Sequence, residues 1–159
     1  MQHVSKWSAP YCNLFKINTD AGLDLFKVVV GLGIIIRYHS GSILASSTQR
    51  MTVGFSVLVA EALASSLIPA VLETDSLGVV AAINSPSNYL SEVGLVIFDI
   101  VELLGFCLGS KVQFVPHSAN IVVHTLARFA LSLDRDCFWI EDNHVCLVEA
   151  LVVDNQVSS

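Results

Sequence analysis

The sequence predicts an α/β fold built on a mixed sheet of five strands with helices on its faces. Three strand-like segments (14–20, 28–38 and 43–51) follow one another through short links, which is typical of an antiparallel meander. Two further strand-like segments (70–74 and 111–115) each follow a helix-like segment, which is typical of parallel strands joined by helices. Three antiparallel strands followed by two parallel ones therefore make the sheet mixed.

The first strand carries a polar face that ends in a carboxylate. Phe15 and Ile17 point to one side, whereas Lys16, Asn18 and Asp20 point to the other. We expect Asp20 to lie at or near the end of this strand.

The second strand contains the longest apolar run of the chain, residues 28–36. Gly31 and Gly33 interrupt this run, and Lys27 and Arg37 flank it. A run of this length is too short to span a bilayer, so it indicates a buried strand.

Helices are predicted over residues 56–64, 77–83, 92–108 and 120–133. Ser76 is placed to cap the second of these helices, because its hydroxyl can accept from a free backbone N–H. On the last helix Asn120, His124 and Arg128 are spaced four apart and therefore share one face.

Length and composition are those of one intracellular domain. The chain has 159 residues, 53% of them hydrophobic, and its mean hydropathy is +0.67. The N-terminus lacks the apolar block of a secretion signal, so we expect the nucleus or the cytoplasm, and a monomer with no membrane attachment. The four cysteines contain no Cys-x-x-Cys pair, which favours reduced thiols over a zinc site.

The net charge of −6 and the pI near 5.1 argue against strong nonspecific binding to nucleic acid, which needs clustered Lys and Arg. A role on nucleic acid must therefore be catalytic and metal-assisted, or depend on a partner for affinity.

Three carboxylates are expected to converge at one edge of the sheet. Asp20 comes from the first strand, Glu61 from the first helix, and Asp75 directly follows the strand 70–74. Converging carboxylates repel one another unless a divalent cation lies between them, and oxygen ligands suit Mg²⁺ or Mn²⁺. Two alternatives stay open: Asp75 helps to cap the next helix, and Glu61 belongs to a solvent-facing stripe.

Ordered motifs over residues 7–154 resemble the plant ribonuclease H-like domain of reverse-transcriptase-derived proteins. These motifs are Trp7-x-x-Pro10, Lys16-Ile17-Asn18-Thr19-Asp20, Gly31-x-Gly33 with Arg37 and Gly41, Ala60-Glu61-Ala62, Glu73-Thr74-Asp75-Ser76, Val115-Pro116-His117-x-Ala119-Asn120, His124-x-Leu126-Ala127 and the tail from Trp139 to Asp154. The resemblance implies a single domain over residues 7–154 and a ribonuclease H-like fold.

The resemblance also implies a two-metal endonuclease that hydrolyses the RNA strand of RNA–DNA hybrids. Asp20 and Asp75 would bridge two Mg²⁺ or Mn²⁺ ions, and Glu61 would bind one of them or orient a water molecule. His124 matches the position of the family's fourth aspartate, and His117 matches a loop histidine that assists proton transfer or product release. The alternatives are a capping or core role for His124 and a plain surface role for His117.

The chain departs from the family pattern between Glu61 and Asp75, which are only 14 positions apart. The family spends more residues there, so we expect the first helix to be shorter by roughly two turns. This shortening, His124 and the acidic charge support an alternative function: a catalytically inactive module that binds nucleic acid or protein.

Overall fold

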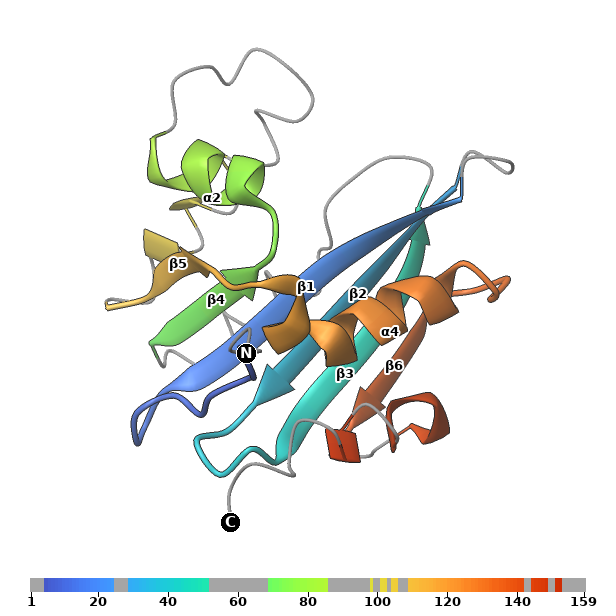
Figure 1. Ribbon diagram of the computed structural model, residues 1–159, viewed down its shortest axis with the longest axis horizontal. Coiled ribbons are helices and arrows are strands. Elements are labelled where there is room, and N and C mark those ends of the chain that lie inside the picture. The colour runs from blue at the N-terminus through green and yellow to red at the C-terminus, as the bar shows by residue number, and fades with distance from the viewer. Residues whose placement is uncertain are drawn as a thin grey trace.

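The computed structural model describes residues 5–24, 29–51, 69–85, 98, 101–102, 104–105, 109–141, 144–148 and 151–152. Its strands form one sheet in the order β5-β4-β1-β2-β3-β6 (Figure 1). The strands are β1 (Phe15–Asp24), β2 (Val29–Arg37), β3 (Ile43–Met51), β4 (Ala70–Thr74), β5 (Lys111–Phe114) and β6 (Cys137–Ile140). The helices are α2 (Leu77–Asn84), α4 (Ile121–Ala130) and the 3₁₀ turns η1 (His117–Ala119) and η2 (Val145–Leu147).

The sheet is mixed, and the predicted fold class is confirmed. β1, β2 and β3 form an antiparallel meander, whereas β4 pairs parallel with both β1 and β5. The sheet has six described strands rather than the predicted five, because β6 pairs antiparallel with β3 at the outer edge.

Two further expectations need correction. β1 continues to Asp24, so Asp20 lies within the strand rather than at its end, and it pairs there with Gly33 of β2. The last helix spans Ile121–Ala130 and is shorter than the predicted 120–133. Of the predicted helix 92–108, the described residues Phe98, 101–102 and 104–105 are helical, and the predicted helix 56–64 lies outside the described residues.

Both faces of the sheet are covered, which explains the continuous apolar run of β2. Ile34 and Ile36 point into a core with Leu72 of β4 and Ile83 of α2. Ile35 points to the opposite face, into a core that α4 and the segment around Leu147 close. A strand that is buried on both faces does not alternate between apolar and polar residues.

Helix α4 approaches the sheet closely because β2 carries glycines beneath it. A Cβ atom added at Gly33 would lie 2.5 Å from the Val123 carbonyl oxygen and 2.6 Å from the Ala127 nitrogen. One added at Gly31 would lie 2.3 Å from the Ala127 carbonyl oxygen. The glycine pair therefore allows α4 to lie across β1, β2 and β3, as Figure 1 shows.

Within the described residues, no helix is long and apolar enough to cross a membrane. Cys12, Cys137 and Cys146 are free thiols, as predicted, and Cys107 lies outside the described residues.

Candidate metal centre

Asp20 and Asp75 come from neighbouring parallel strands. Thr19 of β1 pairs with Thr74 of β4, so the next residues, Asp20 and Asp75, lie side by side where β4 ends. Asp75 is the first residue after β4, and Ser76 caps α2 by accepting from the Val79 N–H at 3.3 Å. The predicted strand-to-helix corner at Asp75 is therefore present, and Ser76 rather than Asp75 supplies the side-chain cap.

His124 of α4 faces Asp20. His124 Nδ1 lies 2.7 Å from Asp20 Oδ2, and the second oxygen, Oδ1, accepts from the Ala21 N–H at 2.7 Å. An ionised carboxylate only accepts hydrogen bonds, so the pair places a proton on Nδ1 of the imidazole. Both side chains are largely buried, with 29% of His124 and 12% of Asp20 exposed.

His117, the first residue of η1, makes a second histidine–aspartate pair. His117 Nδ1 lies 2.9 Å from Asp75 Oδ2, and 53% of the His117 side chain is exposed. The other oxygen of Asp75, Oδ1, lies 3.4 Å from the Asn120 side-chain nitrogen. Asp75 is therefore held from two sides by residues of one segment, η1 and the start of α4.

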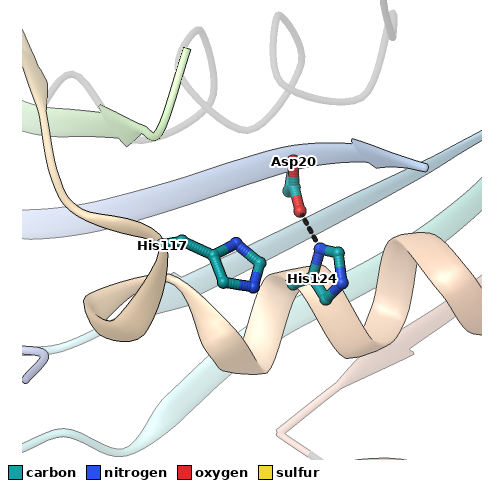
Figure 2. Close-up of side chains that lie close together, drawn as sticks. All are labelled: Asp20, His117 and His124. Atoms are coloured by element: carbon teal, nitrogen blue, oxygen red, sulfur yellow. Dashed lines mark hydrogen bonds and ion pairs between the residues drawn. The ribbon is translucent and has the colours of Figure 1, made fainter.

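The two pairs meet through their imidazole rings. The rings of His117 and His124 are 4.3 Å apart between centroids and cross nearly edge to face. One potential ligand atom from each of Asp20, His117 and His124 lies within 4.8 Å of the others (Figure 2). The described part of the predicted site thus offers carboxylate oxygens and imidazole nitrogens, a donor set that fits a divalent cation.

Burial raises the pKa of the Asp20 carboxyl above its ordinary value of 3.8. The hydrogen bonds from His124 and from the Ala21 N–H lower this pKa, and the negative charge of Asp75 raises it. The electrostatic effect of Asp75 on Asp20 agrees with two carboxylates that share one site. A cation bound there would relieve both the burial cost and the repulsion.

Glu61, the third predicted carboxylate, lies outside the described residues. The structure therefore places Asp20, Asp75, His117 and His124 of the predicted site residues, and it brings all four together.

A buried polar network lies behind the site, and the sequence analysis did not predict it. Lys16 Nζ and Glu73 Oε1 form an ion pair at 2.8 Å, with both side chains almost fully buried. Gln113 donates to the same oxygen at 2.8 Å, and the Asn18 amide donates to Glu73 Oε2 at 2.9 Å. These contacts satisfy both carboxylate oxygens of Glu73, as a buried charge requires.

The network reaches the site through two asparagines. The Asn18 amide also donates to Asn120 Oδ1 at 3.1 Å, and Asn120 Nδ2 donates to the Thr19 carbonyl oxygen at 3.0 Å. Since Asn120 Nδ2 also lies near Asp75, Asn120 links the buried pair to the site. The alternation that put Lys16 and Asn18 on the face of Asp20 was the only local signal for this network.

Trp7 and Arg37 close the network on the side away from the site. The Arg37 guanidinium lies 3.8 Å from the centre of the Trp7 ring, which is a cation–π geometry. Trp7 Nε1 and Arg37 Nη2 both donate to Asn18 Oδ1, at 3.1 and 3.3 Å. All four hydrogen-bonding positions of the Asn18 amide are therefore used.

A sequence model of the family described as "Reverse transcriptase-like" matches residues 18–130. The match begins within β1 and ends with α4, so it includes Asp20, Asp75, His117 and His124. No curated protein sequence matches this chain.

Several solved structures share the fold. RNase H1 from the halophilic archaeon Halobacterium salinarum NRC-1 superposes with a TM-score of 0.63 at 18% identity, covering 75% of this chain and 98% of that one. LC11-RNase H1, isolated from compost by a metagenomic approach, gives 0.59 at 17% identity, covering 76% and 96%. The same protein in complex with an RNA/DNA hybrid gives 0.57 at 16% identity, covering 74% and 96%. The fold is therefore ribonuclease H-like.

Proposed function

Since this chain belongs to the reverse transcriptase-like family, we propose that it is a metal-dependent endonuclease that hydrolyses the RNA strand of RNA–DNA hybrids. Within the family we place it in the plant ribonuclease H-like branch, because of its own motifs and above all His124. We propose a single domain over residues 7–154 that acts inside the cell on nucleic acid. One structure with the same fold, LC11-RNase H1, is bound to an RNA/DNA hybrid.

The observation that carries the proposal is the meeting of Asp20 and Asp75 beside two imidazoles. Neighbouring parallel strands deliver the two carboxylates, and α4 and η1 deliver His124 and His117. We propose that Asp20, Asp75 and His124, together with Glu61, hold two Mg²⁺ or Mn²⁺ ions. Bound there, such ions would lower the pKa of a water molecule and would stabilise the leaving oxygen of a phosphodiester.

The protein side chains then have separate tasks. Asp20 and Asp75 would supply the negative charge that holds the metal ions. His124 would add a neutral nitrogen donor without adding negative charge. His117 lies at the exposed margin of the site, with its Nδ1 proton held by Asp75. When no metal ion is bound to it, His117 fits the role in proton transfer or product release that the resemblance implies for this histidine.

Cleavage of a labelled RNA–DNA hybrid, with Mg²⁺ and with Mn²⁺, tests this function. We expect cleavage of the RNA strand only. We also expect a loss of at least about 100-fold in rate for Asp75→Asn, because this change removes a negative charge that would hold the metal ions. Asp136→Asn is the matched control, because Asp136 precedes β6 and accepts from the Arg50 N–H of β3, without contact to the described site residues. Equal rates for wild type and Asp75→Asn would refute the enzyme proposal.

A second function, a catalytically inactive module that binds nucleic acid or protein, is favoured by one feature of the site. Both described carboxylates are already paired with histidines, which reduces their repulsion without any metal. Thermal unfolding with increasing Mg²⁺ or Mn²⁺ separates the two functions. A bound ion raises the melting temperature by mass action, whereas an inactive module without an ion site shows no rise.

A further inference from the structure

We propose that His117 is itself a metal ligand, and that Asp20, His117 and His124 bind a late first-row divalent ion in preference to Mg²⁺. This inference deepens the proposed function, because it concerns the same site and its choice of metal. It gives Asp75 a second task, which is to orient His117.

The geometry brings three donors from three separate elements to one point. Asp20 comes from β1, His117 from η1 and His124 from α4, and a ligand atom of each lies within 4.8 Å of the other two. Figure 2 shows the His117 ring reaching from its turn towards His124, with Asp20 above the two rings and joined to His124 by the dashed line. These three residues therefore form a group that could hold one metal ion.

Asp75 prepares His117 for this role. The Asp75 carboxylate accepts from His117 Nδ1 at 2.9 Å, so Nδ1 carries the proton and Nε2 keeps its lone pair. Histidines that bind metals usually donate their other ring N–H to a carboxylate or carbonyl in this way, which fixes the tautomer and the ring orientation. Asp75 is itself held by Asn120, so the orientation is set by a side chain with a buried anchor.

The chemistry of the donors sets the choice of ion. Two imidazole nitrogens and one carboxylate, with room for water, are typical of zinc and related ions in catalytic sites. Mg²⁺ prefers oxygen ligands and binds through carboxylates and water. Affinity for nitrogen donors rises along the series from Mn²⁺ to Co²⁺ and beyond, so Co²⁺ is expected to bind more tightly than Mn²⁺ and much more tightly than Mg²⁺.

The experiment titrates the metal-free protein with Co²⁺ by visible absorption and with Mg²⁺ by calorimetry. His117→Ala is the main variant, because the His117 side chain is half exposed. Its loss removes the partner of Asp75 Oδ2, whereas Asp75 Oδ1 keeps its contact with Asn120. We expect Co²⁺ affinity to fall by at least about 10-fold in His117→Ala, with an altered absorption band, and by about 10- to 100-fold in Asp75→Asn. Mg²⁺ affinity should change less in His117→Ala than Co²⁺ affinity does.

His39→Ala is the matched control, because His39 is an exposed histidine in the turn between β2 and β3. Its Co²⁺ affinity and absorption band should equal those of the wild type. Unchanged Co²⁺ binding in His117→Ala overturns the inference, and so does an equal loss of Co²⁺ and Mg²⁺ binding.

The outcome is separable from that of the proposed function. Co²⁺ binding that depends on His117, without any hybrid cleavage, supports this inference and refutes the nuclease. Hybrid cleavage that depends on Asp75, with Co²⁺ binding indifferent to His117, supports the nuclease and refutes this inference.

Discussion

At the scale of single residues, Asn120 contributes more to the site than its neutral side chain suggests. It is almost fully buried at the start of α4, where its amide nitrogen faces two oxygens, those of Thr19 and Asp75. Its own oxygen accepts from Asn18. The orientation of the Asn120 amide is therefore determined by its neighbours. An asparagine side chain supplies both the donor and the acceptor that these positions need.

Asn120→Asp tests this assignment. The change keeps the size of the side chain but replaces the donor with an oxygen that faces the Thr19 carbonyl and the Asp75 carboxylate. We expect the free energy of unfolding to fall by about 3 kcal/mol at neutral pH, because the new buried carboxylate would face two oxygen atoms that it cannot donate to. Urea denaturation measures this loss.

Asn84→Asp is the matched control for that measurement. Asn84 is exposed at the end of α2, so an added negative charge there should cost no more than about 1 kcal/mol. Equal losses in the two variants would mean that Asn120 is not held as described.

At the scale of secondary-structure elements, the distance between α4 and the sheet determines whether His124 reaches Asp20. The glycines of β2 leave no side chain between them, and Ala127 and Ala130 keep the facing side of the helix small. A helix raised by even one methyl group would draw His124 away from β1. The Gly31-x-Gly33 motif is therefore part of the site although neither glycine touches a ligand.

Gly33→Ala and Gly78→Ala form a matched pair that tests this dependence. The new methyl group at Gly33 would clash with the α4 backbone, and we expect a loss of about 1–3 kcal/mol in stability together with weaker metal binding. Gly78 is an exposed residue of α2, and the nearest atom to a Cβ added there is 3.9 Å away. Gly78→Ala should therefore stabilise the protein by about 0.5–1 kcal/mol. Chemical denaturation of both variants provides the measurement, and a stable Gly33→Ala variant would contradict the close approach.

At the scale of the whole molecule, little positive charge is free to meet nucleic acid. The chain has eight Lys and Arg residues against 14 Asp and Glu. Lys16 and Arg37 are buried in the network behind the site, so neither is available to a phosphate. Any affinity for a hybrid must then come from a few contacts and from the metal site.

The salt dependence of hybrid binding tests this conclusion. Each phosphate contact by Lys or Arg contributes about 0.9 to the slope of log affinity against log salt concentration. We expect a slope no steeper than about −3, which corresponds to three or fewer such contacts. Fluorescence anisotropy with Asp75→Asn, which prevents cleavage, measures the slope. A slope as steep as that of a strongly basic binding protein would refute this view of the surface.

Much of the fold followed from local patterns, because those patterns arise from neighbouring residues. The meander, the parallel strand β4, the Ser76 cap and the placement of Asp75 after β4 all match the sequence-based predictions. Strand β6 was missed because it is defined by pairing with β3, which is far away in the chain. The end of β1 was misplaced because the strand continues past Asp20 and pairs with the start of β2. The role of Glu61 stays a prediction.

By itself, the sequence determined the fold class, the family and the neighbouring positions of Asp20 and Asp75. Only the tertiary structure decided which histidine pairs with which carboxylate, and that Lys16 and Glu73 are a buried pair connected to the site by Asn18 and Asn120. The physical reason is separation along the chain: Asp20 and His124, or Asn18 and Asn120, are more than 100 residues apart. Periodicity reports which face a side chain occupies, whereas its partner there depends on how closely α4 packs against the sheet.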